Sequence, residues 1–362
     1  MSAPRRLKFS LKSHSEFVDT LRKRVNSYFE DGDIAKDGGS QIVVKTIVMF
    51  LMYLVPYFFI LSGFVTNPYI YIGLWILMGF GGVGIGVNVM HDANHGAFSK
   101  NAFWNKVFGK SVNLIGGNAT TWKIQHNVLH HAFTNIDGMD HDLEGPKFLR
   151  FSPHQERRWY HRFQHIYAWF FYGFQTISRA IVTDFSSAVT FRKLNLIKKR
   201  RDYRKLLINI TLGRLFYFSY ALVLPLIFAP VSIWLVILGF ATMQYVTGLF
   251  LALIFQSAHV MPDCEFPVAT EDGKMENNWA VHQLQTTTNF SPKSRLFSWF
   301  IGGLNFQVEH HLFSNISHTH YRKISKIVSE TAAEFGVPYY SQKTFLHAVI
   351  AHGRMLKRLG TA

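Results

Sequence analysis

The sequence predicts an all-α membrane protein whose four transmembrane helices form two hairpins. Three observations support this fold class: the length of the apolar segments, their pairing, and the distribution of Lys and Arg. A helix needs roughly 20 apolar residues to cross a bilayer. Four segments approach that length, in two close pairs, at residues 42–65, 69–90, 208–229 and 231–256.

The turns within the two pairs contain no Lys or Arg, whereas these residues are frequent in the rest of the chain. The parts rich in Lys and Arg are residues 1–41, 97–207 and 260–362. Because such parts stay in the cytoplasm, we expect both termini there. Each pair of spans is then a hairpin that enters the membrane from the cytoplasmic side.

No Pro/Gly/Ser-rich linker divides the 362 residues, so we interpret residues 42–345 as one domain. A cytosolic segment, 1–41, precedes it and a cytosolic tail, 346–362, follows it. The formal net charge of +16 could indicate nucleic-acid binding. However, apolar blocks rich in aromatic residues, without an RNA-binding signature, favour a membrane surface. We therefore expect the lipid bilayer, and no nucleic acid, as a partner. The single cysteine, Cys264, excludes Cys-based metal sites.

Two segments carry more specific expectations. Arg214 lies early in the third span, where it is tolerable if its long side chain extends to the cytoplasmic interface. Residues 161–181 are aromatic but interrupted by polar residues. This pattern predicts an amphipathic helix at the membrane interface, with a re-entrant segment as the alternative.

Three histidine clusters lie at or beyond the expected cytoplasmic ends of the spans. They are His91-Asp92-Ala93-Asn94-His95, His126-Asn127-Val128-Leu129-His130-His131 and Gln307-Val308-Glu309-His310-His311. On an α-helix, the i, i+4 pairs His91/His95 and His126/His130 each project from one face. Imidazole binds iron, copper, nickel and zinc alike. Seven histidines and one glutamine exceed the four ligands of a closed zinc site, which favours two metal ions.

These clusters, in this order around two pairs of spans, closely resemble the three histidine boxes of the membrane fatty acid desaturase and hydroxylase superfamily. The resemblance covers residues from about 40 to 340. It implies a cytosolic helical cap over the four spans that encloses a non-haem di-iron site, with O2 as co-substrate. Matched by motif, the implied iron ligands and catalytic residues are His91, His95, His126, His130, His131, His310 and His311.

His259, at the end of the fourth span, matches a further iron ligand of stearoyl-CoA desaturases. Those enzymes have an asparagine one turn earlier that binds a water on one iron, where this chain has Phe255. Gln307 replaces the first histidine of the third box and is a candidate ligand through its amide oxygen. Because the box is preceded by Asn305-Phe306 and followed later by Gly336-Val337-Pro338-Tyr339, the chain looks like a front-end desaturase. Sphingolipid desaturases of similar pattern share that glutamine.

The resemblance implies O2-dependent insertion of a double bond into a long acyl chain carried as acyl-CoA or acyl-lipid. Front-end enzymes place it between an existing double bond and the carboxyl end. A fatty acyl or sphingolipid hydroxylase on the same scaffold is the alternative, because both reactions begin with hydrogen abstraction. A non-catalytic membrane metal carrier is disfavoured, since transported ions bind near the membrane midplane.

Many front-end enzymes carry a fused cytochrome b5 domain with a His-Pro-Gly-Gly haem motif, which this sequence lacks. We therefore expect a separate electron donor, either cytochrome b5 or a ferredoxin with its reductase. The basic run from Lys198 to Arg201 is a candidate docking surface for it. The absence of a fused donor also favours a bacterial inner membrane over the endoplasmic reticulum.

Neutral imidazoles leave the charge of two irons less neutralised than carboxylates would, so acidic residues are expected to orient the rings from behind. The candidates are Asp92, Asp140, Asp142 and Glu309. Trp279 and Thr286–Thr288 are candidates to line an acyl passage, with a structural role as the alternative. Four histidines outside the clusters are not expected to bind metal: His141, His282, His318 and His320.

Overall fold

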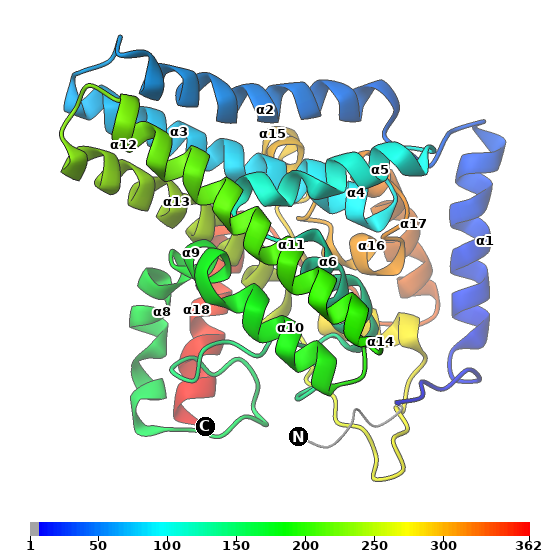
Figure 1. Cartoon of the computed structure of the whole chain (residues 1–362). Helices are drawn as coiled ribbons and strands as arrows, with labels where there is room; N and C mark the ends of the chain where they lie inside the picture. Colours follow the sequence, from blue (N-terminus) through cyan, green and yellow to red (C-terminus); the bar gives the residue numbers. More distant parts are fainter. Residues whose placement is uncertain (1–6) are drawn as a thin grey trace.

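The protein is almost entirely helical, which confirms the expected all-α class (Figure 1). The computed structural model describes residues 7–362. Within that range the one sheet consists of two short parallel strands, β1 (Thr288–Phe290) and β2 (Tyr340–Gln342). In the sequence, β1 precedes the third histidine cluster and β2 follows it. Their pairing therefore brings together the two parts of the chain that flank this cluster.

Four helical stretches are long and apolar enough to cross a membrane. The first is α2 (Gly39–Ser62) and the fourth is α13 (Ile233–His259). The second and third stretches, Pro68–His95 and Arg200–Phe228, each contain a π-helical turn within them. Their parts in chain order are α3 (Pro68–Gly84), η1 (Ile85–Met90), α4 (His91–His95), α11 (Arg200–Phe218), η6 (Ser219–Val223) and α12 (Leu224–Phe228).

These helices match the four expected segments, but their ends differ in a way that matters for the site. From hydropathy we expected the second span to end at residue 90 and the fourth at residue 256, because polar residues follow these positions. The helices continue to His95 and His259. Two histidine-bearing segments are therefore direct continuations of spanning helices.

Two hairpins are present, with their turns at the same end of the bundle (Figure 1). Gly63, with a φ of 79°, ends α2 in the left-handed conformation that glycine adopts readily. The side chain of Asn67 caps α3 by accepting hydrogen bonds from the N–H groups of Tyr69 and Ile70. Ser232 caps α13 in the same way through the N–H of Leu235. The stop and start signals are thus encoded locally.

α3 is the central helix of the bundle and packs against both α2 and α13. Trp75 and Met78 of α3 are fully buried. At Gly81 the backbone of α2 around Tyr53 approaches so closely that a side chain would not fit. By contrast, α2 exposes apolar side chains such as Val44 and Phe58 on its outer face. An exposed apolar surface on a spanning helix is expected where lipid covers it.

The remaining helices gather at the other end of the bundle. One group shares a hydrophobic core and consists of α1 (Ser15–Asp31), α14 (Trp279–Thr286), α16 (Gln307–Leu312) and α17 (Tyr321–Glu334). A second core joins α8 (Gln164–Tyr172) and α18 (Phe345–Thr361) to the end of α13. The residues expected to be a C-terminal tail thus form α18, and the segment 1–41 contributes α1.

Shorter helices complete the fold, mostly in the segment between the second and third spans. They are α5 (Ala102–Gly109), η2 (Lys110–Ile115), α6 (Ala119–Lys123), η3 (Ile124–His130), α7 (His131–Phe133), η4 (Trp159–Phe163), α9 (Gln175–Ser178), η5 (Arg179–Thr183), α10 (Asp184–Lys193), α15 (Arg295–Phe300) and η7 (His318–His320). Residues 161–181, expected as one interfacial helix, are divided among η4, α8, α9 and η5, with a break at Gly173. There the aromatic ring of Tyr245 occupies the space that a side chain would need.

Candidate metal centre

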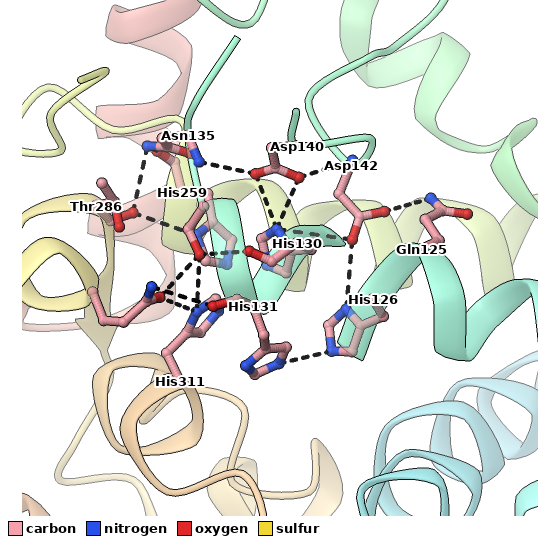
Figure 2. Close-up of polar contacts among 12 residues, drawn as sticks. Gln125, His126, His130, His131, Asn135, Asp140, Asp142, His259, Thr286 and His311 are labelled. Atoms are coloured by element: carbon pink, nitrogen blue, oxygen red, sulfur yellow. Dashed lines mark hydrogen bonds and ion pairs between the residues drawn. The ribbon is translucent and has the colours of Figure 1, made fainter. Parts of the chain in front are cut away.

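All three histidine clusters and His259 converge inside the helical part. Figure 2 shows His259 with members of the second and third clusters. α4 supplies His91 and His95, and α16 supplies His310 and His311. His259 is the last residue of α13. All the histidines of the three clusters and His259 are buried except His95, which is half-buried. Residues more than 200 positions apart in the sequence therefore share one interior volume.

The second cluster differs from the expected α-helix. Residues 124–130 form the π-helix η3, in which hydrogen bonds join residues five positions apart. His131 consequently lies beside His126, with their Nε2 atoms 3.3 Å apart. The ring of His130 stacks on that of His126, with centroids 5.3 Å apart, and also contacts those of His259 and His311. The expected pair His126/His130 therefore stays in contact, but the other histidine neighbours of the two rings belong to two different groups.

The first group joins the first cluster to parts of the other two. One ring nitrogen from each member lies within 4.8 Å of the others, and the members are His91, His95, His126 and His310. His131 adjoins this group, because its Nε2 lies 3.0 Å from Nε2 of His310. The second group is defined in the same way by His130, His259 and His311. His131 also groups with His310 and His311, so it lies between the two groups.

The chemistry of these nitrogens fits metal ions better than a network of hydrogen bonds. Several buried ring nitrogens have no hydrogen-bond partner among the described residues: both nitrogens of His91, Nε2 of His95, His130, His259 and His311, and Nδ1 of His131. An unpaired buried polar atom is costly. Imidazoles that bind one metal at about 2.0–2.1 Å place their nitrogens about 3 Å apart, as seen here between His131 and His310.

Burial also favours the neutral imidazole that metal binding requires. It lowers the pKa of His126 to about 3. It likewise holds the pKa values of His131, His310 and His311 well below the usual range, and the neighbouring histidines add to this effect. These rings therefore present lone pairs at neutral pH.

Carboxylates lie behind two of the rings, as Figure 2 shows. Both oxygens of the buried Asp140 lie 3.0 Å from Nδ1 of His130. Asp140 also accepts hydrogen bonds from the backbone N–H groups of Asn135 and Asp142. Asp142 lies 3.5 Å from Nδ1 of His126 and accepts a hydrogen bond from Gln125 at 2.5 Å. Each contact directs the opposite nitrogen of its ring into the centre.

Three further ring partners have no signal in the histidine motifs. Nδ1 of His311 lies 2.8 Å from the amide oxygen of Gln283, and Nδ1 of His310 lies 3.3 Å from the hydroxyl of Tyr321. Nδ1 of His259 lies 3.4 Å from the carbonyl oxygen of Thr286. α14 and α17 provide these groups. The sequence analysis proposed Thr286 as a residue that lines an acyl passage, and not as a partner of a histidine ring.

Comparison with known proteins identifies the family to which this arrangement belongs. The fatty acid desaturase family matches residues 66–343. The chain belongs to this family. An sn-1 linoleoyl-lipid 6-desaturase of Synechocystis sp. is 34% identical in a 369-residue alignment that covers 100% of both chains. The sn-1 linoleoyl-lipid 6-desaturase of Arthrospira platensis is 32% identical over 95% of this chain and 92% of its own. An acyl-lipid (8-3)-desaturase of Physcomitrium patens is 35% identical over 98% of this chain and 74% of its own.

In this desaturase the residue one turn before His259 is Phe255, as the sequence showed. Its ring packs against those of His130 and His259, with centroids 4.9 Å from each. An apolar ring therefore covers the second histidine group at this point. Trp279 has a structural contact, because its Nε1 donates a hydrogen bond to the carbonyl oxygen of His131.

Glu309 differs from the expectation that it orients a histidine ring. Its carboxylate accepts hydrogen bonds from Asn289 at 2.8 Å and Tyr339 at 2.9 Å, and it contacts no histidine ring of the two groups. Burial raises its pKa to about 7. Through its hydrogen bond with Asn289, Glu309 connects α16 to β1. Gln307 is buried at the start of α16, and its side chain forms no hydrogen bond within residues 7–362.

Arg214 does not extend to an interface, so that expectation is wrong. Only 6% of it is exposed, and its guanidinium is paired with the buried Asp184. Arg179 binds the other oxygen of Asp184 at 3.1 Å and donates to Gln125 at 3.0 Å. Gln125 in turn contacts Asp142, behind His126. A continuous polar chain thus runs from the third span to the metal centre.

The four histidines that were not expected to bind metal have other partners. His282 contacts the carbonyl oxygen of Thr134, His320 that of Asp37, and His141 lies 3.4 Å from Glu144. His318 is different, because it is buried and its Nδ1 lies 2.7 Å from Asp92. It was expected to be peripheral, yet it contacts the acidic residue of the first cluster.

Proposed function

We propose that this desaturase acts on long acyl chains in the front-end manner, using two irons, O2 and electrons from a separate donor. The observation that carries this proposal is the pair of adjacent histidine groups at the ends of two apolar helices. The glutamine of the third box and the relatives named acyl-lipid (8-3)- and linoleoyl-lipid 6-desaturases support the front-end assignment. They also favour an acyl-lipid over an acyl-CoA.

The proposed ligands of the first iron are His91, His95, His126 and His310, and those of the second are His130, His259 and His311. His131 lies close enough to serve either, and Gln307 is a further proposed ligand. When bound, the irons would supply the O2-derived oxidant that removes hydrogen from an unactivated methylene. The chain's own residues would orient the imidazoles, exclude water through rings such as Phe255, and position the acyl chain.

We further propose that both termini face the cytoplasm of a bacterial cell. The absence of Lys and Arg from the two turns supports this orientation. The histidine groups would then lie at the cytoplasmic membrane surface, where an acyl chain from the lipid and a soluble electron donor can both reach them.

Expression in a host with a defined lipid pool tests this function. Cells supplied with linoleate should accumulate a lipid with an additional double bond on the carboxyl side of the existing ones, located by mass spectrometry. Cells that express a His310→Ala variant are the control. A hydroxylated product would identify the hydroxylase alternative, and a new double bond on the methyl side would refute the front-end assignment.

The basic run at the start of the third span leads to a prediction about electron delivery. Lys198, Lys199, Arg200 and Arg201 are all exposed. If an acidic donor docks there, turnover should fall as ionic strength rises, because salt screens the attraction. Replacing all four residues by glutamine should raise the donor concentration needed for half-maximal rate by about tenfold at low salt.

The double-bond position should not change in this quadruple variant, since docking and acyl placement use different surfaces. Steady-state rates at several donor concentrations, with product analysis, measure both effects. A changed double-bond position at saturating donor would assign the basic run to the lipid headgroup and contradict docking.

A further inference from the structure

α2 contains a single charged residue, Lys45, and the structure buries it. Only 3% of its surface is exposed. Lysine is rare within spanning helices because an ammonium group loses its hydration there. A buried lysine with a defined partner is therefore a candidate for a functional role.

The partner of Lys45 is His318, whose Nε2 lies 2.5 Å from the ammonium nitrogen. On its other side, Nδ1 of His318 lies 2.7 Å from an oxygen of Asp92. An ammonium group only donates hydrogen bonds, so Nε2 must accept and Nδ1 must donate to the carboxylate. His318 is thus a neutral bridge between a buried cation and a buried anion.

Asp92 is fixed by more than this bridge. The same oxygen accepts hydrogen bonds from the hydroxyl of Ser317 at 3.1 Å and the backbone N–H of His318 at 3.3 Å. Its other oxygen lies 3.6 Å from Nδ1 of His91. The carboxylate therefore faces two ways, with one oxygen toward the bridge and one toward a proposed iron ligand.

We propose that Lys45 and His318 are positioning residues for His91, acting through Asp92. Together they determine the orientation of the carboxylate behind the His91 ring, and so the strength with which the first histidine group binds its metal. The inference rests on the proposed di-iron function. It connects the first span, which supplies no histidine to the centre, to the metal.

Fold stability alone does not explain this arrangement. Buried ion pairs contribute little net stability, because desolvation offsets their attraction, and apolar residues of similar volume often serve as well. An apolar residue at position 45 would pack into α2 without this cost. The contact with Asp92 through His318 gives the lysine a reason to be there.

Measurement of iron binding to the purified full chain tests the proposal. Lys45→Met preserves most of the side-chain length and removes the charge. It should weaken the binding of one of two irons about tenfold, the lower end of the range for partners behind metal ligands. The other iron should bind as in the wild type. The Mössbauer signal of one iron should change, and Lys45→Arg should restore much of the affinity.

A double-mutant cycle separates action through Asp92 from a general loss of structure. Asp92→Asn should weaken the same iron, and adding Lys45→Met to it should change the affinity less than about twofold. His318→Gln should reproduce Lys45→Met. Lys123→Met, at an exposed lysine of α6, is the control and should bind both irons normally.

Several results would overturn the inference. One is a Lys45→Met variant that binds two irons with wild-type affinity and an unchanged Mössbauer spectrum. Loss of both irons together with the fold, in both Lys45→Met and His318→Gln, would assign these residues to structure only. If the wild type itself binds no iron, the proposed di-iron function fails instead.

Discussion

Replacing His310 by alanine is expected to abolish product formation and to reduce iron binding. His310 belongs to the first histidine group and also lies within 4.8 Å of His131 and His311 at their ring nitrogens. Loss of a partner behind a metal ligand typically costs 10–100-fold in affinity. Loss of a ligand between two groups should cost more, with activity falling by at least about a hundredfold.

Iron analysis of the purified membrane protein, together with lipid analysis of expressing cells, measures this effect. His320→Ala is a suitable control, because His320 is half-buried, contacts the carbonyl oxygen of Asp37 and lies in neither group. The His310→Ala variant should remain inserted in the membrane, since the spans form independently of this side chain. Full turnover with two irons per chain would refute the ligand assignment.

The sequence predicted the spans and the candidate ligands because both are local patterns. Apolar length identifies a spanning helix, and histidine spacing identifies a metal-binding segment. The sequence also anticipated that the clusters could meet, since all follow the ends of spans. The structure brings together the seven cluster histidines and His259 as that argument required.

The sequence could not predict features that depend on tertiary contacts or on unusual helix geometry. The π-turn at 124–130 changes which histidines are neighbours, and residue types alone do not distinguish it from an α-helix. Gln283 and Tyr321 reach the rings only because α14 and α17 pack over the centre. Arg214 was misjudged because its partner, Asp184, lies on a separate helix.

Among the acidic residues expected to orient histidine rings, some contact a ring and one does not. Asp140 and Asp142 lie behind rings, and their position close after the second cluster made this predictable. Glu309 is adjacent to a proposed ligand in sequence. Its side chain nevertheless points away from the histidine groups and accepts a hydrogen bond from Tyr339. Adjacency on a short helix does not determine direction, because neighbouring side chains diverge by roughly a quarter turn or more.

Asp140→Asn is expected to weaken the binding of the second iron without unfolding the protein. The carboxylate contacts Nδ1 of His130 through both oxygens, and both partners are fully buried. Asparagine has the same shape and can still accept one hydrogen bond, but it removes the charge that increases the basicity of the ring. Iron affinity at the second group should therefore fall about 10–100-fold.

Alanine would be a poorer choice at this position, because the backbone N–H groups of Asn135 and Asp142 would lose their buried acceptor. The amide oxygen of asparagine preserves one of these two contacts, so the variant disturbs the loop less than alanine would. Activity should be low at limiting iron and should recover substantially when iron is in excess. Anaerobic titration with Fe(II), followed by turnover assays, measures both quantities.

Asp142→Asn provides the matched comparison. Asp142 is partly exposed and lies 3.5 Å from His126, so its attraction for the ring is weaker and better screened. Its replacement should lower iron affinity by less than about tenfold, and more at the first group than at the second, because the carboxylate lies 3.5 Å from Nδ1 of His126 and 3.9 Å from Nδ1 of His130. The two variants should then differ in which iron they weaken more. If Asp140→Asn binds both irons as tightly as the wild type, the carboxylate serves only to cap the surrounding loop, and packing against rings such as Phe255, His259 and His311 orients His130.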